Sequence, residues 1–189
     1  MAINLLLLLM QIVFSIFSYL GWIRFLLQWG NAPVNNIFTQ QIIKISQPIL
    51  KPFQWIVGSH KNYNFAALLF LLLLNIIEIL LMIGLFYHTF PDLGGLLLWA
   101  IIKMILQACQ IIFYGTIVFA LMSWFPSLVQ SPLGQCIIAI IAPIVNLFRR
   151  FIPTIGIFDL SAMAVIIAII FIQFILNAAI IKAIALALA

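Results

Sequence analysis

Two ionisable side chains, Glu78 and Lys103, lie inside long apolar stretches of this sequence. If both stretches are membrane helices, a rise of about 1.5 Å per residue places Glu78 about 15 Å and Lys103 about 10 Å from the same bilayer surface. A charge at that depth is costly and usually faces a partner. We therefore expect Glu78 either to pair with Lys103 or to be protonated. The pair would act as structural glue, and the alternatives are a proton or ion relay and a contact with a partner protein.

Other polar residues repeat at helical spacing within the apolar stretches. Lys103, Gln107, Gln110 and Tyr114 follow a 4, 3, 4 spacing, which places them on one face of a helix. Shorter stripes are formed by Gln11, Ser15 and Ser18, by Asn75 and Glu78, and by Gln173 and Asn177. Such stripes either line a polar conduit or supply interhelical hydrogen bonds, and the second role is common for these residue types in membranes. We expect mainly interhelical bonding.

A further polar cluster, RRFIPTIGIFDLS, follows residue 148. Arg149 and Arg150 end an amphipathic stretch, at a level where lipid phosphates are available. Pro153 and Gly156 allow the chain to turn. Asp159 then stands where a helix N-cap belongs, and it could also pair with either arginine.

The sequence lacks the motifs of known enzyme classes. It has no Ser-His-Asp or Cys-His set, no phosphate-binding glycine loop and no zinc-ligand spacing. His60 and His88 are expected at opposite faces of a membrane, and Cys109 and Cys136 read as apolar filler. We therefore expect no enzymatic activity, no catalytic or metal-binding residues and no cofactor.

Composition places most of the surface in lipid. Hydrophobic residues make up 67% of the 189 residues and charged residues only 6%, whereas soluble domains carry about a quarter charged residues. The net charge of +5 is scattered, which argues against nucleic acid and favours anionic lipid headgroups. The first apolar run has no basic n-region or clear cleavage site, so we expect it to be a retained membrane helix.

Four segments are long enough to cross a bilayer as helices, which takes about 20 residues. They are residues 3–29, 65–88, 94–124 and 159–182, with connectors at 30–64 and 125–158. The sequence therefore predicts an all-α integral membrane protein with four transmembrane helices.

The chain also reads as an internal repeat. A shift of 95 residues superposes Trp29 on Trp124, Pro48 on Pro143, and Asn64 on Asp159 without a gap. We divide the chain into a first repeat, residues 1–94, and a second, residues 95–189. Each would contain helix, amphipathic connector and helix, so the two would be parallel repeats related by an axis along the membrane normal.

The connectors have an amphipathic pattern. Within residues 37–54 the polar face is Gln40, Lys44, Gln47, Lys51 and Gln54, and the apolar face is Phe38, Ile42, Ile45, Ile49 and Phe53. Such a helix lies in the headgroup plane. We expect Pro48 to break it into two pieces, with Asn35 or Asn36 as its cap. The more apolar second connector is either interfacial or re-entrant, with a bend at Pro143.

Basic residues predict the orientation. The connectors and their flanks contain Arg24, Lys44, Lys51, Lys61, Arg149 and Arg150, whereas the opposite side holds only Lys103 and Lys182. The positive-inside rule then places both connectors in the cytoplasm and both termini in the periplasm.

The run Ala142 to Pro153, APIVNLFRRFIP, resembles the signature of the YGGT family, together with Gly156, Asp159, Ser161 and the upstream Ser123-Trp124. Gln47 to Pro52 is similar to the same motif in the first half. That half departs from the pattern, because Gln54, Trp55, Gly58 and Asn64 stand in the places of Arg149, Arg150, Pro153 and Asp159. Any role of the basic pair would then belong to the second half.

The resemblance implies a bacterial inner-membrane protein linked to osmotic stress or ion homeostasis. Plastid members of the family are similar to factors for haem attachment to a cytochrome and for nucleoid or membrane organisation. We expect a non-enzymatic scaffold or accessory factor with an unidentified membrane-protein partner. The alternatives are a small channel or transporter, formed as a homo-oligomer, and a factor for cofactor or complex assembly.

Overall fold

The computed structural model describes residues 2–57, 64–86, 91–150 and 160–188. Across these ranges the chain forms seven helices and no strands, which confirms the all-α prediction. The four long helices are α1 (Ala2–Trp29), α3 (Phe65–Phe86), α4 (Leu93–Met122) and α7 (Leu160–Leu188). They match the four predicted segments, although α7 continues beyond the expected end at residue 182.

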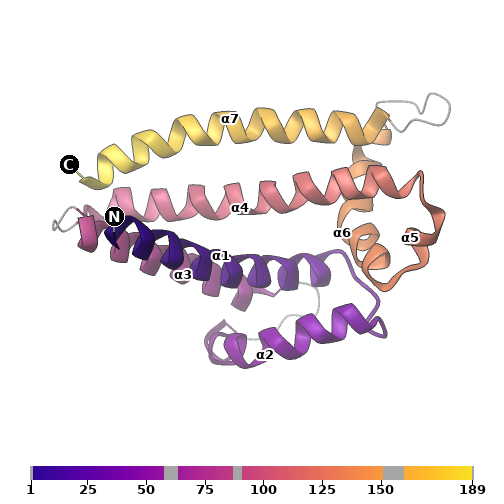
Figure 1. Ribbon diagram of the computed structural model, residues 1–189, viewed down its shortest axis with the longest axis horizontal. Coiled ribbons are helices and arrows are strands. Elements are labelled where there is room, and N and C mark those ends of the chain that lie inside the picture. Colours follow the sequence, from indigo (N-terminus) through magenta and orange to yellow (C-terminus); the bar gives the residue numbers. More distant parts are fainter. Residues whose placement is uncertain (1, 58–63, 87–90, 151–159, 189) are drawn as a thin grey trace.

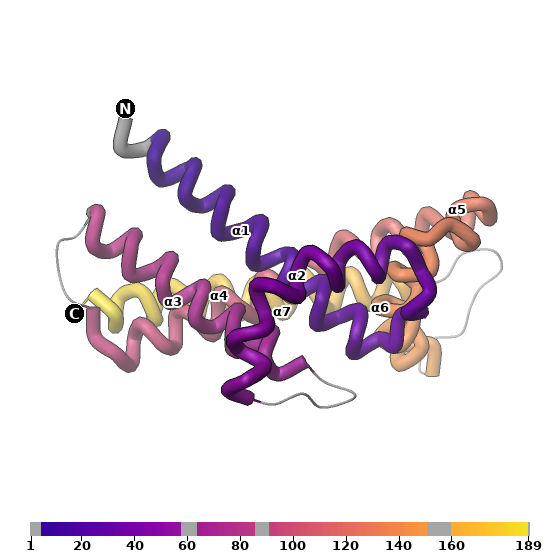
Figure 2. The backbone as a smooth tube through the Cα atoms, turned by 90° about the horizontal axis from the view of Figure 1, so that it is seen from below, coloured from indigo at the N-terminus to yellow at the C-terminus, as the bar shows by residue number. Residues whose placement is uncertain are grey.

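The long helices run side by side in alternating directions (Figure 1). Contacts join α4 to α7, α1 to α3, and α3 to α4. The start of α1 and the end of α7 lie at the same end of the bundle, and α5 and α6 lie toward the other (Figures 1 and 2). The helix of the first connector, α2, runs back along the side of the bundle to its middle. In the described ranges five helices, not four, are long and apolar enough to cross a membrane, because α6 (Pro132–Arg149) also qualifies.

The first connector differs from the expected pair of helices, whereas the second does contain two helices. The first contains one continuous helix, α2 (Ile37–Val57), with Pro48 and Pro52 inside it. The second contains the short α5 (Pro126–Gln130) and then α6, which continues through Pro143. The predicted break at Pro48 is therefore wrong, although the axis of α2 turns visibly along its length (Figure 2). The bend expected at Pro143 stays a prediction.

Two apolar clusters hold the bundle together. Near the connectors, Leu27, Leu50, Leu71, Ile141 and Val165 are buried together and join α1, α2, α3, α6 and α7. Toward the other end, a second cluster joins α3, α4 and α7 and contains Ile79, Ile83, Leu96, Trp99, Ala100, Ile102, Ala183 and Ala187. The outer faces remain apolar, which suits contact with lipid chains rather than water; on α7 the exposed side chains include Ile167, Phe171, Phe174 and Ile181.

Local signals fix the helix ends. Asn31, with φ of 52°, ends α1 in the left-handed conformation, and the Ala32 N–H donates to the Leu27 carbonyl at 2.9 Å. Asn36 begins α2, since its Oδ1 accepts from the Phe38 N–H at 2.9 Å. This confirms one of the two caps expected there, and Ser131 caps α6 in the same way through the Gly134 N–H.

Candidate functional site

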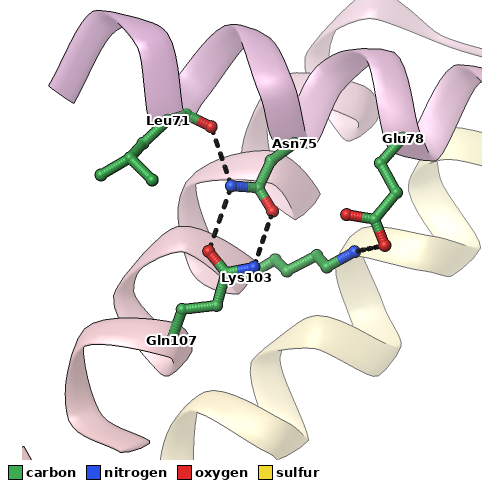
Figure 3. Close-up of polar contacts among 5 residues, drawn as sticks. All are labelled: Leu71, Asn75, Glu78, Lys103 and Gln107. Carbon is green, nitrogen blue, oxygen red and sulfur yellow. Dashed lines mark hydrogen bonds and ion pairs between the residues drawn. The ribbon is translucent and has the colours of Figure 1, made fainter. Parts of the chain in front are cut away.

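The helix pair α3–α4 brings Glu78 and Lys103 together inside the bundle. Lys103 Nζ lies 2.5 Å from Glu78 Oε1, and the side chains of Lys103 and Glu78 are 27% and 6% exposed (Figure 3). The pairing expected from their similar depths is therefore present. Because a carboxylate in an apolar interior needs a counter-charge, this contact stabilises α3 against α4.

An amide pair lies beside this ion pair. Asn75 Nδ2 donates to Gln107 Oε1, and Gln107 Nε2 donates to Asn75 Oδ1, both at 3.3 Å (Figure 3). Asn75 also donates to the Leu71 carbonyl at 2.8 Å. Spacings of three residues from Asn75 to Glu78 and four from Lys103 to Gln107 keep each helix's two residues on one face. The result is a two-rung polar ladder between α3 and α4, here called the α3–α4 ladder.

Some buried polar atoms stay outside these contacts. Within the described ranges, Glu78 Oε2, Ser18 Oγ, Trp22 Nε1 and Arg24 Nε are buried and have no hydrogen-bond partner. Three of them belong to α1, and Glu78 Oε2 belongs to the ladder. The ladder therefore uses one carboxylate oxygen and leaves the second in an apolar setting.

The remaining stripe residues do not join the ladder. Gln110 accepts a bond from the Tyr19 hydroxyl at 3.0 Å and so links α4 to α1, while Tyr114 is exposed. Asn177 is exposed on α7, and Gln173 is half-buried there. The bond between Tyr19 and Gln110 is thus a contact between helices.

The arginine pair stands at the end of α6. Arg149 and Arg150 are exposed, and Arg149 Nη1 donates to Asn146 Oδ1 at 3.1 Å. Pro153, Gly156 and Asp159 lie outside the described residues, so the predicted turn, cap and ion pair there stay predictions.

The equivalent first-half cap and the two connector prolines are visible. Asn64 Oδ1 accepts from the Ala67 N–H at 3.2 Å, which confirms that Asn64 caps α3. Pro48 and Pro143 are both exposed on their helices. They are therefore absent from the closest packing between helices.

A polar seam between the two connectors was not predicted. Asn36 Nδ2 donates to the Pro132 carbonyl at 2.7 Å and to Gln135 Oε1 at 3.1 Å. Thr39 Oγ1 lies 3.2 Å from Cys136 Sγ. This α2–α6 seam joins the starts of both connector helices and gives Cys136, expected to be filler, a polar neighbour. One feature of the sequence could have indicated this seam. Thr39 is a polar residue on the side of the helix that the amphipathic pattern assigned to the interior.

The grooves near the connectors in the described ranges include two with charged side chains in their lining. The α4–α6–α7 groove has a volume of about 640 Å³, and its polar members include Asn146 and Arg149. The α1–α2 groove has a volume of about 420 Å³ and is lined by Arg24, Gln28 and Thr39 among others. Neither groove contains a residue of the α3–α4 ladder. Neither groove was predicted from the sequence, because each depends on how the connector helix folds back on its neighbouring helices.

Metal binding has no support in the described ranges. No group of three or more His, Cys, Asp or Glu side chains there could hold a metal ion. His60 and His88 lie outside those ranges, so the absence of a metal or cofactor stays an expectation.

Comparison with known proteins finds a family whose model matches this chain. The family model described as CCB3/YggT matches residues 3–85 and again residues 98–180. The uncharacterized protein YggT of Escherichia coli (strain K12) is 25% identical over 163 residues, covering 86% of this chain and 84% of that protein. An uncharacterized protein of Vibrio alginolyticus, described as encoded in the proC 3′ region, is 26% identical over 170 residues, covering 89% and 91%.

A third relative, an uncharacterized protein of Haemophilus influenzae, is 27% identical over 151 residues, covering 80% of each chain. No solved structure matches the chain. The family model covers most of the described helices, including both connector helices and the α3–α4 ladder. The chain therefore belongs to the CCB3/YggT family.

Proposed function

We propose that this protein is a non-enzymatic scaffold or accessory factor of the bacterial inner membrane, and that its working surface is the connector end. The observation that carries the proposal is the α3–α4 ladder. Its ion pair and amide pair use the strongest polar groups of the spans in contacts between helices. A scaffold needs such rigid spans, whereas a conduit needs polar groups that face a water-filled path.

We infer that the chain is a tandem repeat with four membrane crossings. The two family-model matches begin at residues 3 and 98, which reproduces the shift of 95. The caps Asn36 and Ser131 are related by the same shift, as are the buried Leu50 and Val145. The start of α1 and the end of α7 lie at the same end of the bundle (Figure 1), which supports an even number of membrane crossings. In this arrangement α6 is an interfacial or re-entrant helix.

The connector end would face the cytoplasm, with both termini in the periplasm. Six of the eight lysine and arginine residues lie in the connectors or their flanks, and cytoplasmic loops carry such an excess. The surface there offers the exposed Arg149 and Arg150 and the exposed apolar Leu147. It suits a membrane-protein partner in a process such as osmotic or ion homeostasis.

Site-specific photocrosslinking in native membranes tests this proposal. A photoreactive residue would replace Leu147 on α6 in one variant and Phe174 on α7 in the control, both being exposed apolar positions. We expect one discrete protein adduct from position 147 and only lipid adducts from position 174. The same adduct pattern from both positions, or no protein adduct at 147, would contradict a connector-end working surface.

A further inference from the structure

The α4–α6–α7 groove has the size and lining of a site for a chain-like apolar ligand. Its volume of about 640 Å³ falls within the usual range of small-molecule sites, about 300–1,000 Å³. Helices α4, α6 and α7 supply most of its walls, α5 adds Val129, and nearly all of the side chains are apolar. The wall residues include Ile117, Leu121, Ile138, Ala142, Met163 and Ile166.

The polar side chains of the groove provide a site for an anion. Arg149 and Asn146 lie about one turn apart on α6, and the bond from Arg149 Nη1 to Asn146 Oδ1 orients the guanidinium. A guanidinium has five N–H donors in a planar fork that matches the oxygens of a phosphate. Trp124, which also lines the groove, is 60% exposed. Exposed tryptophan and arginine side chains are typical of the boundary between lipid chains and headgroups.

The first half provides an internal comparison. Leu27, Gln28, Val34 and Ile43 line the α1–α2 groove, and a shift of 95 residues takes them to Met122, Ser123, Val129 and Ile138, which line the α4–α6–α7 groove. The two grooves are thus equivalent in position but differ in chemistry.

Only the second-half groove combines an apolar wall with a cation at its connector edge. The position of Arg149 corresponds to Gln54 in the first half, and Gln54 does not line the α1–α2 groove. That groove carries its cation, Arg24, on a span helix, among Gln28, Asn31 and Thr39. The two grooves therefore differ in where the cation lies and in how polar its neighbours are.

We propose that the α4–α6–α7 groove binds one anionic phospholipid of the bilayer, with an acyl chain along the apolar wall and the phosphate bound by Arg149. The combination of a long apolar wall and one cation at the headgroup level matches the two parts of such a lipid. The α1–α2 groove has no comparable preference. The site is independent of the proposed scaffold role, because it requires only that the chain lies in a bilayer.

Quenching of Trp124 fluorescence by brominated lipids tests the site. The protein would be reconstituted in phosphatidylcholine vesicles that contain brominated phosphatidylglycerol or, separately, brominated phosphatidylcholine. The difference between the protein and Trp124→Phe isolates the signal of Trp124. One arginine near a membrane surface corresponds to about fivefold preference for an anionic lipid. We expect that preference in the native protein.

Variants separate the arginine from general charge. Arg149→Gln, which installs the residue of the first half, should reduce the preference to about onefold, and Arg149→Lys should keep most of it. Lys51→Gln removes an exposed cation of α2 outside the groove and should leave the preference unchanged. Ala142→Phe, which fills the apolar wall, should reduce quenching of Trp124 by both lipids.

Equal quenching by the two lipids in the native protein, or a preference that survives Arg149→Gln, would overturn the proposal. Displacement of the brominated lipid by millimolar inorganic phosphate would also overturn it, since the site would then belong to a soluble anion.

Discussion

The contact between Glu78 and Lys103 gives the protein's interior its main electrostatic constraint. A nearly buried carboxylate is tolerable there because an ammonium lies beside it, and Lys103 keeps part of its side chain exposed. Removing one partner leaves an uncompensated charge, whereas replacing both removes the requirement altogether.

Lys103→Met should therefore lower the free energy of unfolding by about 3 kcal/mol, the lower part of the range for a broken buried pair. The double variant Glu78→Gln with Lys103→Met should lose less than Lys103→Met alone, because no buried carboxylate remains. Unfolding by SDS titration in mixed micelles would measure the double variant and the two single variants, Lys103→Met and Glu78→Gln. A double variant that loses the sum of the two single losses would show that the pair is not coupled.

The amide pair should be weaker. Interhelical hydrogen bonds in membranes average about 0.6 kcal/mol and reach about 1.7 kcal/mol. Since Asn75 and Gln107 share two bonds, a double-mutant cycle with Asn75→Leu and Gln107→Leu should give a coupling of about 1 kcal/mol. A coupling near zero in the same SDS titration would contradict the reciprocal geometry.

At this scale the sequence predicted the ion pair but not the amide pair. Depth along a helix follows from residue number, so Glu78 and Lys103 could be matched in advance. The rotation of each helix about its own axis depends on packing by residues such as Leu71 and Ile79, which the polar stripes do not specify. The polar stripes on α1 and α7 therefore lie outside the α3–α4 ladder.

At the scale of elements, close approach of helices depends on small residues. At Gly95 on α4, an added Cβ would meet the backbone of Ala187 on α7, and Ala183 and Ala187 are fully or almost fully buried. Gly84 on α3 has nothing within 4 Å of such an added carbon. The two glycines therefore form a matched pair for testing this contact.

Gly95→Ala should destabilise the protein by about 1–3 kcal/mol, the usual cost of overpacking. Gly84→Ala should be neutral or slightly stabilising, because alanine favours a helix by about 1 kcal/mol over glycine. Thermal unfolding in detergent compares the two. Equal melting temperatures would mean that α4 and α7 do not approach closely at Gly95.

The positions of the long helices could be predicted because runs of apolar residues set their lengths. The continuity of α2 through Pro48 could not be predicted. Pro48 and its i−4 residue Lys44 both lie on the exposed side of α2. A hydrogen bond lost on that side can be replaced by water or headgroups, so the helix tolerates the proline. Asn36, Thr39 and Cys136 were also missed as a group, because their contact depends on how α2 and α6 cross.

At the scale of the whole molecule, the proposed topology has an even number of membrane crossings and places both connectors in the cytoplasm. A reporter enzyme active only in the periplasm, fused after residue 189, should therefore be active. The same reporter inserted in the first connector should be inactive. An inactive C-terminal fusion beside an active N-terminal one would support five crossings, with α6 as a span.

We propose that the polar residues of the spans hold helices together and do not conduct ions. The most direct test is the flux of protons and K⁺ into liposomes that contain the purified protein, with Glu78→Gln as the matched variant. For both proteins we expect fluxes equal to those of protein-free liposomes. A protein-dependent flux that Glu78→Gln abolishes would contradict it.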